Sequence, residues 1–486
     1  MRLTDRTLFK QACLVDGQWL QSSDGAVLNV TNPFDESVLG TVPLCTAEDV
    51  RKAIQAAERA WPAWREITAG ERAARLHKLH RLILDNLEDL AVILTMEQGK
   101  TLADAKGEIL LGAGYLPWYA EEARRKYGLV IPCNGQGKQP MTFSQPIGVA
   151  ALISPWNFPS SMLTRKLAAA LAAGCTIVAK PASATPYSAL AIAELALRAG
   201  IPAGVYNVIT GQAKVVGKEL TSSTTVKALS FTGSTEVGKQ LLADCAGTVK
   251  KVSWELGGNA PYIIFDDADL DRATQCFIGC KFRNSGQTCV SANRVLVQRG
   301  VHDALVEKFC EHISKLVLGY GLDAGVSQGP LISTAAADAM QAYVDDAVKK
   351  GAQVRLGGTK PSGLGPNFFE PTVLTGVTPA MRLWNEELFG PVVPLTVFDS
   401  EEEGLNLAND TPYGLASYLF TKDIGRIWRM ARGLEYGMVG VNEVALASGE
   451  VPFGGVKESG LGREGGVHGL EEYMETKYVL LGNLLH

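Results

Sequence analysis

The chain has 486 residues, of which 46% are hydrophobic and 20% are charged, and its formal net charge is −5. A chain of this length is too long for one hydrophobic core, so we expect two or three domains. Slight acidity without a basic block argues against nucleic-acid binding, and the most apolar run, residues 167–179, is shorter than the roughly 20 residues that span a bilayer.

The N-terminus and the nine cysteines indicate where the protein acts. The opening sequence MRLTDRTLFKQACLVDG lacks the apolar region of a secretory signal. The cysteines are scattered singly, and an odd number without paired spacing favours reduced thiols in a cytosol over a disulfide framework. Cys276 and Cys280 have no histidine cluster nearby, so no metal site is predicted there. We therefore expect a cytoplasmic protein without a metal.

The first elements in chain order are predicted to be helical, over residues 46–126. Thr46, with Asp49 three residues later, is typical of a helix N-cap, and the apolar residues at helical spacing stop near Gly99. A strand, a turn at 146–148 and a second strand are predicted next.

Strands and short helices then alternate, and the helices are predicted to end at Gly174 and Gly200. This alternation predicts the α/β class, with a parallel, doubly wound sheet that binds ligands at the carboxyl ends of its strands. A second alternating region from Ala260 predicts a second α/β domain. Cys289 lies in that region, between a predicted helix and a predicted strand.

The loop sequence FRNSGQTCVSANR makes Cys289 a candidate nucleophile. A cysteine that only packs in a core would more naturally lie in an apolar run, whereas this one follows Gly286, Gln287 and Thr288. The thiolate is the reactive form, so the surroundings of Cys289 must lower the pKa of its thiol.

Three further motifs each allow a functional and an ordinary interpretation. LSFTGSTEVGKQL places Gly233 and Ser234 at a helix N-terminus, which suits a phosphate but could be a plain turn, because the spacing G-x-G-x-x-G is absent. Glu255 in SWELGG is either a solvated strand-end carboxylate or a general base. Asn157 in SPWNFP is either a turn residue or an oxyanion donor.

Taken together and in this order, PWNFP, FTGSTEVG, ELGGN, GQTC, EELFGP and PFGGVKESGLGRE resemble the aldehyde dehydrogenase superfamily over nearly the whole chain. The resemblance implies that Cys289 attacks an aldehyde carbonyl and that the Asn157 amide and the Cys289 backbone N–H hold the resulting oxyanion. It also implies that Glu255 activates the water that hydrolyses a thioester. A non-catalytic member would have lost Cys289, and a CoA-acylating member would lack Glu255.

The resemblance also implies a dinucleotide site without the usual glycine fingerprint, formed by Trp156, Lys180, Ser183, Gly233, Ser234, Glu387 and Phe389. Many NAD-using members have a glutamate where this chain has Ser183. A glutamate would repel a 2′-phosphate, whereas Ser183 can hydrogen-bond to it and Lys180 can pair with it. We therefore expect NADP to be preferred, with NAD as the alternative.

Arg165, Arg283 and Ser448 resemble the residues with which succinate-semialdehyde dehydrogenases hold the far carboxylate of their substrate. Glutarate semialdehyde is the nearest rival substrate, and a general aldehyde dehydrogenase with structural arginines is the other alternative. Some succinate-semialdehyde enzymes have a second cysteine two residues after the nucleophile. Here that residue is Ser291, so a redox switch of that kind is not expected.

By the same resemblance the chain should have three parts. A dinucleotide-binding domain is expected over 1–125 and 148–256, a catalytic domain over 257–440, and an oligomerisation element over 126–147 and 470–486. The alternating apolar residues of the C-terminal tail suit a strand added to a neighbour's sheet. A homodimer or homotetramer is implied.

Overall fold

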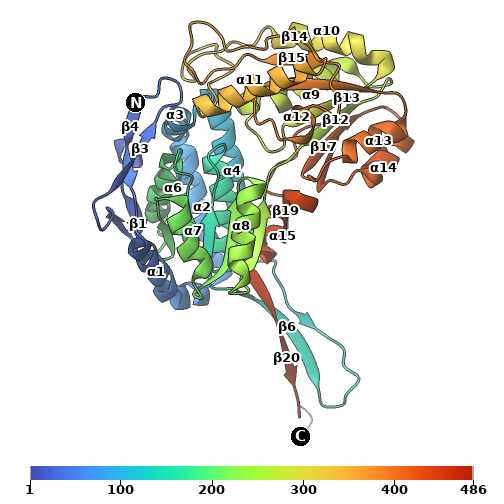
Figure 1. Cartoon of the computed structure of the whole chain (residues 1–486). Coiled ribbons are helices and arrows are strands. Elements are labelled where there is room, and N and C mark those ends of the chain that lie inside the picture. The colour runs from blue at the N-terminus through green and yellow to red at the C-terminus, as the bar shows by residue number, and fades with distance from the viewer. Residues whose placement is uncertain (1, 484–486) are drawn as a thin grey trace.

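The computed structural model describes residues 2–483, which form two large sheets, a three-stranded sheet and a two-stranded sheet, with helices packed around them. The chain runs through the first large sheet and its helices, then through the second, and returns to the first near its end (Figure 1). The predicted α/β class is confirmed. No helix within residues 2–483 is long and apolar enough to cross a membrane.

The first large sheet has eight strands. In spatial order they are β19 (Gly460–Leu461), β11 (Lys251–Glu255), β10 (Val226–Thr232), β7 (Val149–Ile153), β8 (Thr176–Lys180), β9 (Tyr206–Val208), β1 (Cys13–Val15) and β2 (Gln18–Leu20). The five central strands are parallel, as predicted. The edge strands β1, β2 and β19 are antiparallel and were not predicted, because runs of two or three residues carry no readable periodicity.

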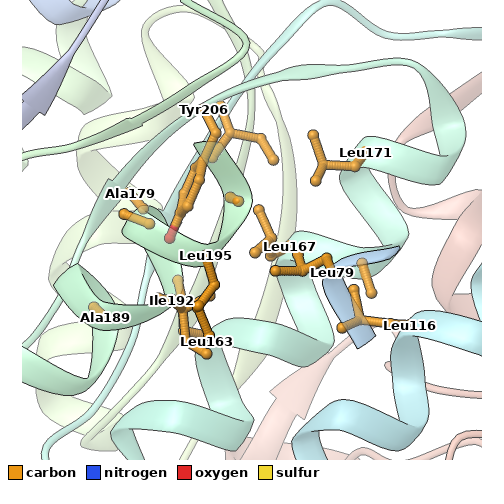
Figure 2. Close-up of a cluster of buried hydrophobic side chains, with 14 of the residues drawn as sticks. Leu79, Leu116, Leu163, Leu167, Leu171, Ala179, Ala189, Ile192, Leu195 and Tyr206 are labelled. Atoms are coloured by element: carbon orange, nitrogen blue, oxygen red, sulfur yellow. The ribbon is translucent and has the colours of Figure 1, made fainter. Parts of the chain in front are cut away.

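Helices cover both faces of this sheet. They are α1 (Ala47–Glu66), α2 (Ala69–Asp85), α3 (Leu87–Gln98), α4 (Leu102–Glu122), α5 (Pro159–Ala173), α6 (Tyr187–Arg198), α7 (Ala213–Ser222) and α8 (Thr235–Ala246), with a 3₁₀ turn η1 (Arg6–Leu8). The predicted cap is confirmed, since Thr46 and Asp49 form a capping box, and Gly99 ends α3 in a left-handed conformation. Apolar side chains fill the core beside α5 and α6, where Leu163 and Leu167 lie near Ile192 and Leu195 and the ring of Tyr206 packs among them (Figure 2).

The second large sheet has seven strands, in the order β14 (Gln353–Leu356), β15 (Thr372–Thr375), β16 (Val392–Phe398), β13 (Ala292–Gln298), β12 (Ala260–Ile264), β17 (Ala416–Phe420) and β18 (Met438–Val441). The other elements of this half are α9 (Leu270–Lys281), η2 (Arg283–Gly286), η3 (Arg299–Val301), α10 (His302–Ile313), α11 (Thr334–Lys349), α12 (Arg382–Asn385), α13 (Glu401–Asn409) and α14 (Ile424–Gly433). Cys289 follows η2 in a loop before β13, as predicted.

Two small sheets and a return segment complete the fold. β3 (Val27–Thr31) pairs with β4 (Val38–Pro43), and β5 (Leu129–Val130), β6 (Gln139–Pro146) and β20 (Met474–Leu481) form a three-stranded arm that projects from the body (Figure 1). The short elements η4 (Lys457–Ser459) and α15 (His468–Glu471) precede β20. The predicted tail strand pairs along its length with β6 of its own chain, and its addition to a neighbour's sheet stays a prediction. Residues 484–486 of the expected oligomerisation element, and Met1 of the expected dinucleotide domain, lie outside the described residues.

Candidate active site

A cavity of about 700 Å³ lies between the two large sheets. Ten of the thirteen predicted site residues line it, namely Trp156, Asn157, Lys180, Ser183, Gly233, Ser234, Arg283, Cys289, Glu387 and Phe389. The other three, Arg165, Glu255 and Ser448, are not in the lining, although Met162, Leu256 and Ala447 close to them in sequence are. The carboxyl ends of β7, β8 and β10 point into the cavity, as expected of a parallel sheet.

The loop that carries Cys289 is held in an uncommon backbone conformation. Asn284 and Ser285 have φ values of 53° and 55°, and Gly286 follows with φ 78°. Left-handed conformations of residues other than glycine are sparsely populated and cluster at functional sites. A Cβ atom on Gly286 would lie 2.3 Å from the Gly390 carbonyl oxygen, so only glycine allows this loop to pack against the segment after Phe389.

The lowering of the Cys289 pKa that the sequence predicts is not found, because the surroundings of this thiol shift its pKa upward. Burial, followed by the negative charges of Glu387 and Glu255, raises the pKa of Cys289 to about 12. A nucleophilic thiolate therefore requires a base or a positive charge brought into the cavity.

Asn157 is fixed by three hydrogen bonds. Its side-chain Nδ2 donates to the Gln287 carbonyl oxygen at 3.0 Å. Its own carbonyl oxygen accepts from Lys100 Nζ at 2.8 Å and from Asn284 Nδ2 at 3.0 Å. A primary amide has two N–H donors, so the second one remains to stabilise an oxyanion near Cys289.

A buried ion pair behind Asn157 was not found from the sequence. Lys100 Nζ lies 2.5 Å from Glu108 Oε2, and Glu108 Oε1 accepts from the backbone N–H groups of Ser160 and Ser161 at 2.8 and 3.1 Å. The pair therefore holds the turn that contains Asn157 against the first turn of α5. Both residues belong to predicted helical stretches with no motif, and only their fully buried positions reveal the role.

Glu255 is the last residue of β11, and the glycine turn that follows it packs against the loop that carries Cys289. A Cβ atom on Gly258 would lie 2.5 Å from the Cys289 carbonyl oxygen, so the two segments are in close contact. Burial, and then the charge of Glu464, raise the pKa of Glu255 to about 8. Within residues 2–483 neither carboxylate oxygen of Glu255 has a hydrogen-bond partner. A carboxyl group with such a pKa is suited to general-base work near neutral pH.

Arg165 forms a salt bridge with Glu464, a residue for which no role was predicted. Arg165 Nε lies 2.5 Å from Glu464 Oε2, although its N–H is not aligned for a hydrogen bond, and Lys166 Nζ pairs with Oε1 of the same carboxylate. Burial alone would raise the pKa of Glu464, but the charges of Arg165 and Lys166 hold it below its ordinary value. The Arg165 guanidinium also lies 4.4 Å from the centre of the Phe453 ring.

Arg283, by contrast, is exposed to the cavity. Its guanidinium lies 4.7 Å from the centre of the Phe158 ring, and no carboxylate within residues 2–483 forms a salt bridge with it. Ser448 is half-buried, and its hydroxyl bonds to the Glu450 carboxylate and lowers the pKa of that group. Among the three residues predicted to hold a carboxylate, Arg283 alone lines the cavity, and within residues 2–483 it forms no salt bridge, although Asp104 lines the same cavity.

The far end of the cavity has the features of a dinucleotide site. Ser234 caps α8 and accepts from the Val237 N–H, so the start of this helix faces the cavity. A Cβ atom on Gly233 would lie 2.4 Å from the Phe231 ring, which leaves only the backbone at the surface. Backbone N–H groups at a helix N-terminus suit a phosphate.

Lys180 and Ser183 lie beside this helix start. Lys180 is buried at the end of β8, and burial lowers the pKa of its ammonium to about 8. Lys180 Nζ donates only to the neighbouring Pro181 carbonyl oxygen among the described residues, and Ser183 Oγ donates to the Gly211 carbonyl oxygen at 3.4 Å. Both polar groups can turn to a ligand.

Glu387 and Phe389 lie between this end and Cys289. Glu387 Oε1 accepts from the Gly258 N–H at 2.9 Å, and burial raises the pKa of this carboxyl group to about 7. The rings of Phe389 and Trp156 meet edge to face at 5.5 Å, and Phe389 has φ 53°. The residues present therefore fit a dinucleotide whose reactive end reaches Cys289.

Cys289 and the Asn157 amide line one cavity between two α/β sheets, at the positions expected of a cysteine-dependent dehydrogenase. The chain belongs to the aldehyde dehydrogenase family, whose model matches residues 19–479.

Individual relatives match the chain over its whole length. The glutarate-semialdehyde dehydrogenase of Pseudomonas aeruginosa is 52% identical over 484 residues, with 100% of both chains covered. The NADP(+) succinate-semialdehyde dehydrogenase of Escherichia coli is 52% identical over 482 residues, covering 99% of this chain and 100% of the relative. A solved NADP-dependent enzyme of E. coli superposes with a TM-score of 0.98 at 51% identity, covering 99% and 100% of the two chains.

Proposed function

We propose that the protein oxidises a small aldehyde with a carboxylate at its far end, foremost succinate semialdehyde, to the corresponding acid. The observation that carries this proposal is the exposed guanidinium of Arg283, which lines the same cavity as Cys289 and forms no salt bridge within residues 2–483. Similarity to the E. coli succinate-semialdehyde enzyme supports it. Glutarate semialdehyde is the second candidate, because the P. aeruginosa relative bears that name at the same identity.

The reaction uses three residues around the aldehyde carbonyl. The Cys289 thiolate attacks the carbonyl carbon, and the Asn157 amide with the Cys289 backbone N–H stabilises the oxyanion of the thiohemiacetal. The bound dinucleotide supplies the hydride acceptor. Glu255 then takes a proton from the water that attacks the Cys289 thioester, which releases the acid and restores the thiol.

Arg283 pairs with the far carboxylate of the substrate, since a guanidinium offers two parallel donors to the two oxygens. Arg165 and Ser448 complete the carboxylate site from outside the cavity lining. Because Arg165 is already paired with Glu464, which Lys166 also contacts, its contribution is smaller than that of Arg283.

NADP is the preferred oxidant and NAD the alternative. Ser183 offers a hydroxyl where a carboxylate would repel a 2′-phosphate, and Lys180 offers a positive charge next to it. Trp156, Gly233, Ser234, Glu387 and Phe389 form the rest of the dinucleotide site. The names of the E. coli enzyme and of the E. coli solved structure support this preference.

The proposal includes the assembly. The chain divides into a dinucleotide-binding domain (1–125 and 148–256), a catalytic domain (257–440) and an oligomerisation element (126–147 and 470–486), and it forms a homodimer or homotetramer. Exposed apolar side chains on and beside the three-stranded arm support an interface there; they are Tyr127, Leu129, Val130, Phe143, Tyr478, Leu480 and Leu481. The number of cysteines is odd and their spacing along the sequence is unpaired, which supports a cytoplasmic location.

A panel of aldehydes assayed with NADP and with NAD tests the function. Succinate semialdehyde, glutarate semialdehyde, butanal and pentanal separate the effect of the charge from that of the chain length. We expect the highest kcat/KM for succinate semialdehyde with NADP. A glutarate semialdehyde value above it would select the second candidate, and equal values for all four aldehydes would mean a general aldehyde dehydrogenase.

A further inference from the structure

Two cysteines outside the cavity, Cys13 and Cys45, lie with their sulfur atoms 3.5 Å apart. Cys13 begins β1, and Cys45 immediately precedes Thr46, the N-cap of α1. The structure describes all nine cysteines, and within residues 2–483 this is the only pair with sulfurs in hydrogen-bonding distance. A disulfide bond is about 2.05 Å long, so the sulfurs need to approach by roughly 1.5 Å to form one.

Thr210 bridges the two segments that carry these thiols. Its backbone N–H donates to Cys13 Sγ at 3.3 Å, and its carbonyl oxygen accepts from the Cys45 N–H at 3.3 Å. Its hydroxyl donates to the Pro43 carbonyl oxygen at 2.5 Å. The position of Thr210 therefore depends on the spacing between β1 and the chain that enters α1.

The residues after Thr210 reach the cavity. The Gly211 carbonyl oxygen accepts from Ser183 Oγ, and Ala213, the first residue of α7, lines the cavity together with Ser183. A Cβ atom on Gly211 would lie 3.2 Å from the Cys45 carbonyl oxygen, so this loop packs directly on the cysteine segment. A change in spacing at the thiol pair is thus transmitted through one short loop to the wall beside Ser183.

We infer that Cys13 and Cys45 form an oxidation site, at which a hydroperoxide closes a disulfide that shifts the 210–213 loop and weakens dinucleotide binding. The effect on the dinucleotide rests on the proposed function of the cavity. Formation of the disulfide does not, because it depends only on the two thiols.

The oxidation proceeds in two balanced steps. One thiolate attacks the O–O bond of hydrogen peroxide, which gives a sulfenic acid and a hydroxide that takes up a proton. The second sulfur then attacks the sulfenic sulfur, and water leaves as the S–S bond forms. Two thiols and one peroxide give one disulfide and two waters, so the sulfurs lose the two electrons that the peroxide gains.

Cys13 is the better candidate for the first attack. Hydrogen bonds from Cys45 and then from Thr210 stabilise its thiolate and lower the pKa of Cys13, whereas the hydrogen bond with Cys13 raises the pKa of Cys45. Cys45 is the slightly more exposed of the two, at 5% against 1%. Both are nearly buried, so a small hydroperoxide has better access than a bulky disulfide.

The experiment uses the full-length protein with Cys289→Ser, which removes the cavity thiol from the oxidation. The protein is treated with hydrogen peroxide until the exposed Cys133 is oxidised, and its disulfides are mapped by non-reducing peptide mass spectrometry. NADPH affinity is measured by fluorescence titration before and after treatment. We expect a Cys13–Cys45 cross-linked peptide and at least a threefold rise in the Kd for NADPH, both reversed by dithiothreitol.

Cys45→Ala and Cys13→Ala, each in the Cys289→Ser background, are the matched controls. In either variant the Kd for NADPH should not respond to peroxide. Two results would overturn the inference: thiols that persist at both positions after Cys133 has reacted, or a mapped disulfide that leaves the Kd unchanged. A reduced protein that does not bind NADPH would instead refute the proposed function, and peptide mapping would still decide whether the disulfide forms.

Discussion

Lys100 donates a hydrogen bond from Nζ to the backbone carbonyl oxygen of Asn157, 2.8 Å away, at a fully buried position. Because Glu108 also contacts the Lys100 ammonium, the junction of α3 and α4 holds Asn157, the residue that we propose stabilises the oxyanion. The position of Asn157 therefore depends on the buried pair of Lys100 and Glu108.

Lys100→Met is expected to lower kcat about tenfold, because it loosens the Asn157 turn, and to leave the KM for NADP within about twofold. It also leaves Glu108 without its counter-charge, which should lower the free energy of unfolding by about 3–5 kcal/mol. Steady-state kinetics and urea unfolding measure the two effects. Lys106→Met, at a half-buried lysine of α4 that pairs with the exposed Glu88, is the control. An unchanged kcat in Lys100→Met would remove Lys100 from the positioning of Asn157.

Glu255→Gln should allow one turnover and then stop. The thiohemiacetal step does not need the carboxylate, whereas hydrolysis of the thioester needs a base. Rapid mixing should show a burst of reduced dinucleotide of about one per active site, followed by a slow steady rate. A variant that turns over at the wild-type steady rate would show that another group activates the water.

The pH dependence of the wild-type enzyme follows from the same carboxyl group. Burial and the charge of Glu464 raise the pKa of Glu255 to about 8, and the ionised form is the base. The rate of thioester hydrolysis should therefore rise with pH and reach half its maximum near pH 8. Glu464→Gln removes the negative charge, so the midpoint should move to lower pH. A midpoint that does not respond would mean that Glu464 exerts no electrostatic effect on Glu255.

Arg165→Met should mainly reduce stability. It leaves the buried Glu464 carboxylate with Lys166 as its only counter-charge, so the melting temperature should fall. Selectivity for succinate semialdehyde over butanal should fall less than in Arg283→Ala, because Glu464 already neutralises Arg165. Differential scanning calorimetry and the ratio of the two kcat/KM values are the measurements. A larger loss of selectivity in Arg165→Met than in Arg283→Ala would make Arg165 the principal carboxylate ligand.

Ser183→Glu should reverse the preference from NADP to NAD. The new carboxylate would lie against the 2′-phosphate, and a like-charge contact in a poorly solvated site costs several kcal/mol. The ratio of kcat/KM with the two dinucleotides measures the reversal, and Ser183→Ala separates the loss of the hydroxyl from the added charge. A ratio that is equal in wild type and Ser183→Glu would show that Ser183 does not discriminate.

The central strands, their helices and the loop position of Cys289 could be predicted because each leaves a local pattern: buried runs, helical spacing, and glycines at helix ends. The antiparallel edge strands β1, β2 and β19 could not be predicted, because each is only two or three residues long. In addition, β19 pairs with β11 only after more than 200 residues of intervening chain. The motifs located Cys289, Asn157 and Glu255.

Motifs did not reveal the charged pairs behind these residues. Lys166 and Glu464 are 298 residues apart, and Lys100 and Glu108, although only 8 residues apart, belong to no motif. The sequence shows that each is charged, but only the fold shows which charge is buried against which. Arg165 and Arg283 therefore had the same predicted role, although among residues 2–483 Arg165 pairs with Glu464 outside the cavity lining and Arg283 lines the cavity without a salt bridge.

The most direct test is the selectivity of wild type and Arg283→Ala for succinate semialdehyde over butanal, which has the same number of carbons and no charge. Each protein is assayed with both aldehydes and saturating NADP. Bound substrate is expected to bury the pair between its carboxylate and Arg283, and loss of one partner of a buried charge pair costs about 2–5 kcal/mol. The ratio of kcat/KM values should therefore be high in wild type and fall by roughly 30-fold to several thousand-fold in Arg283→Ala, with butanal oxidation nearly unchanged. Equal kcat/KM values for the two aldehydes in wild type, or an equal loss for both in the variant, would contradict the account.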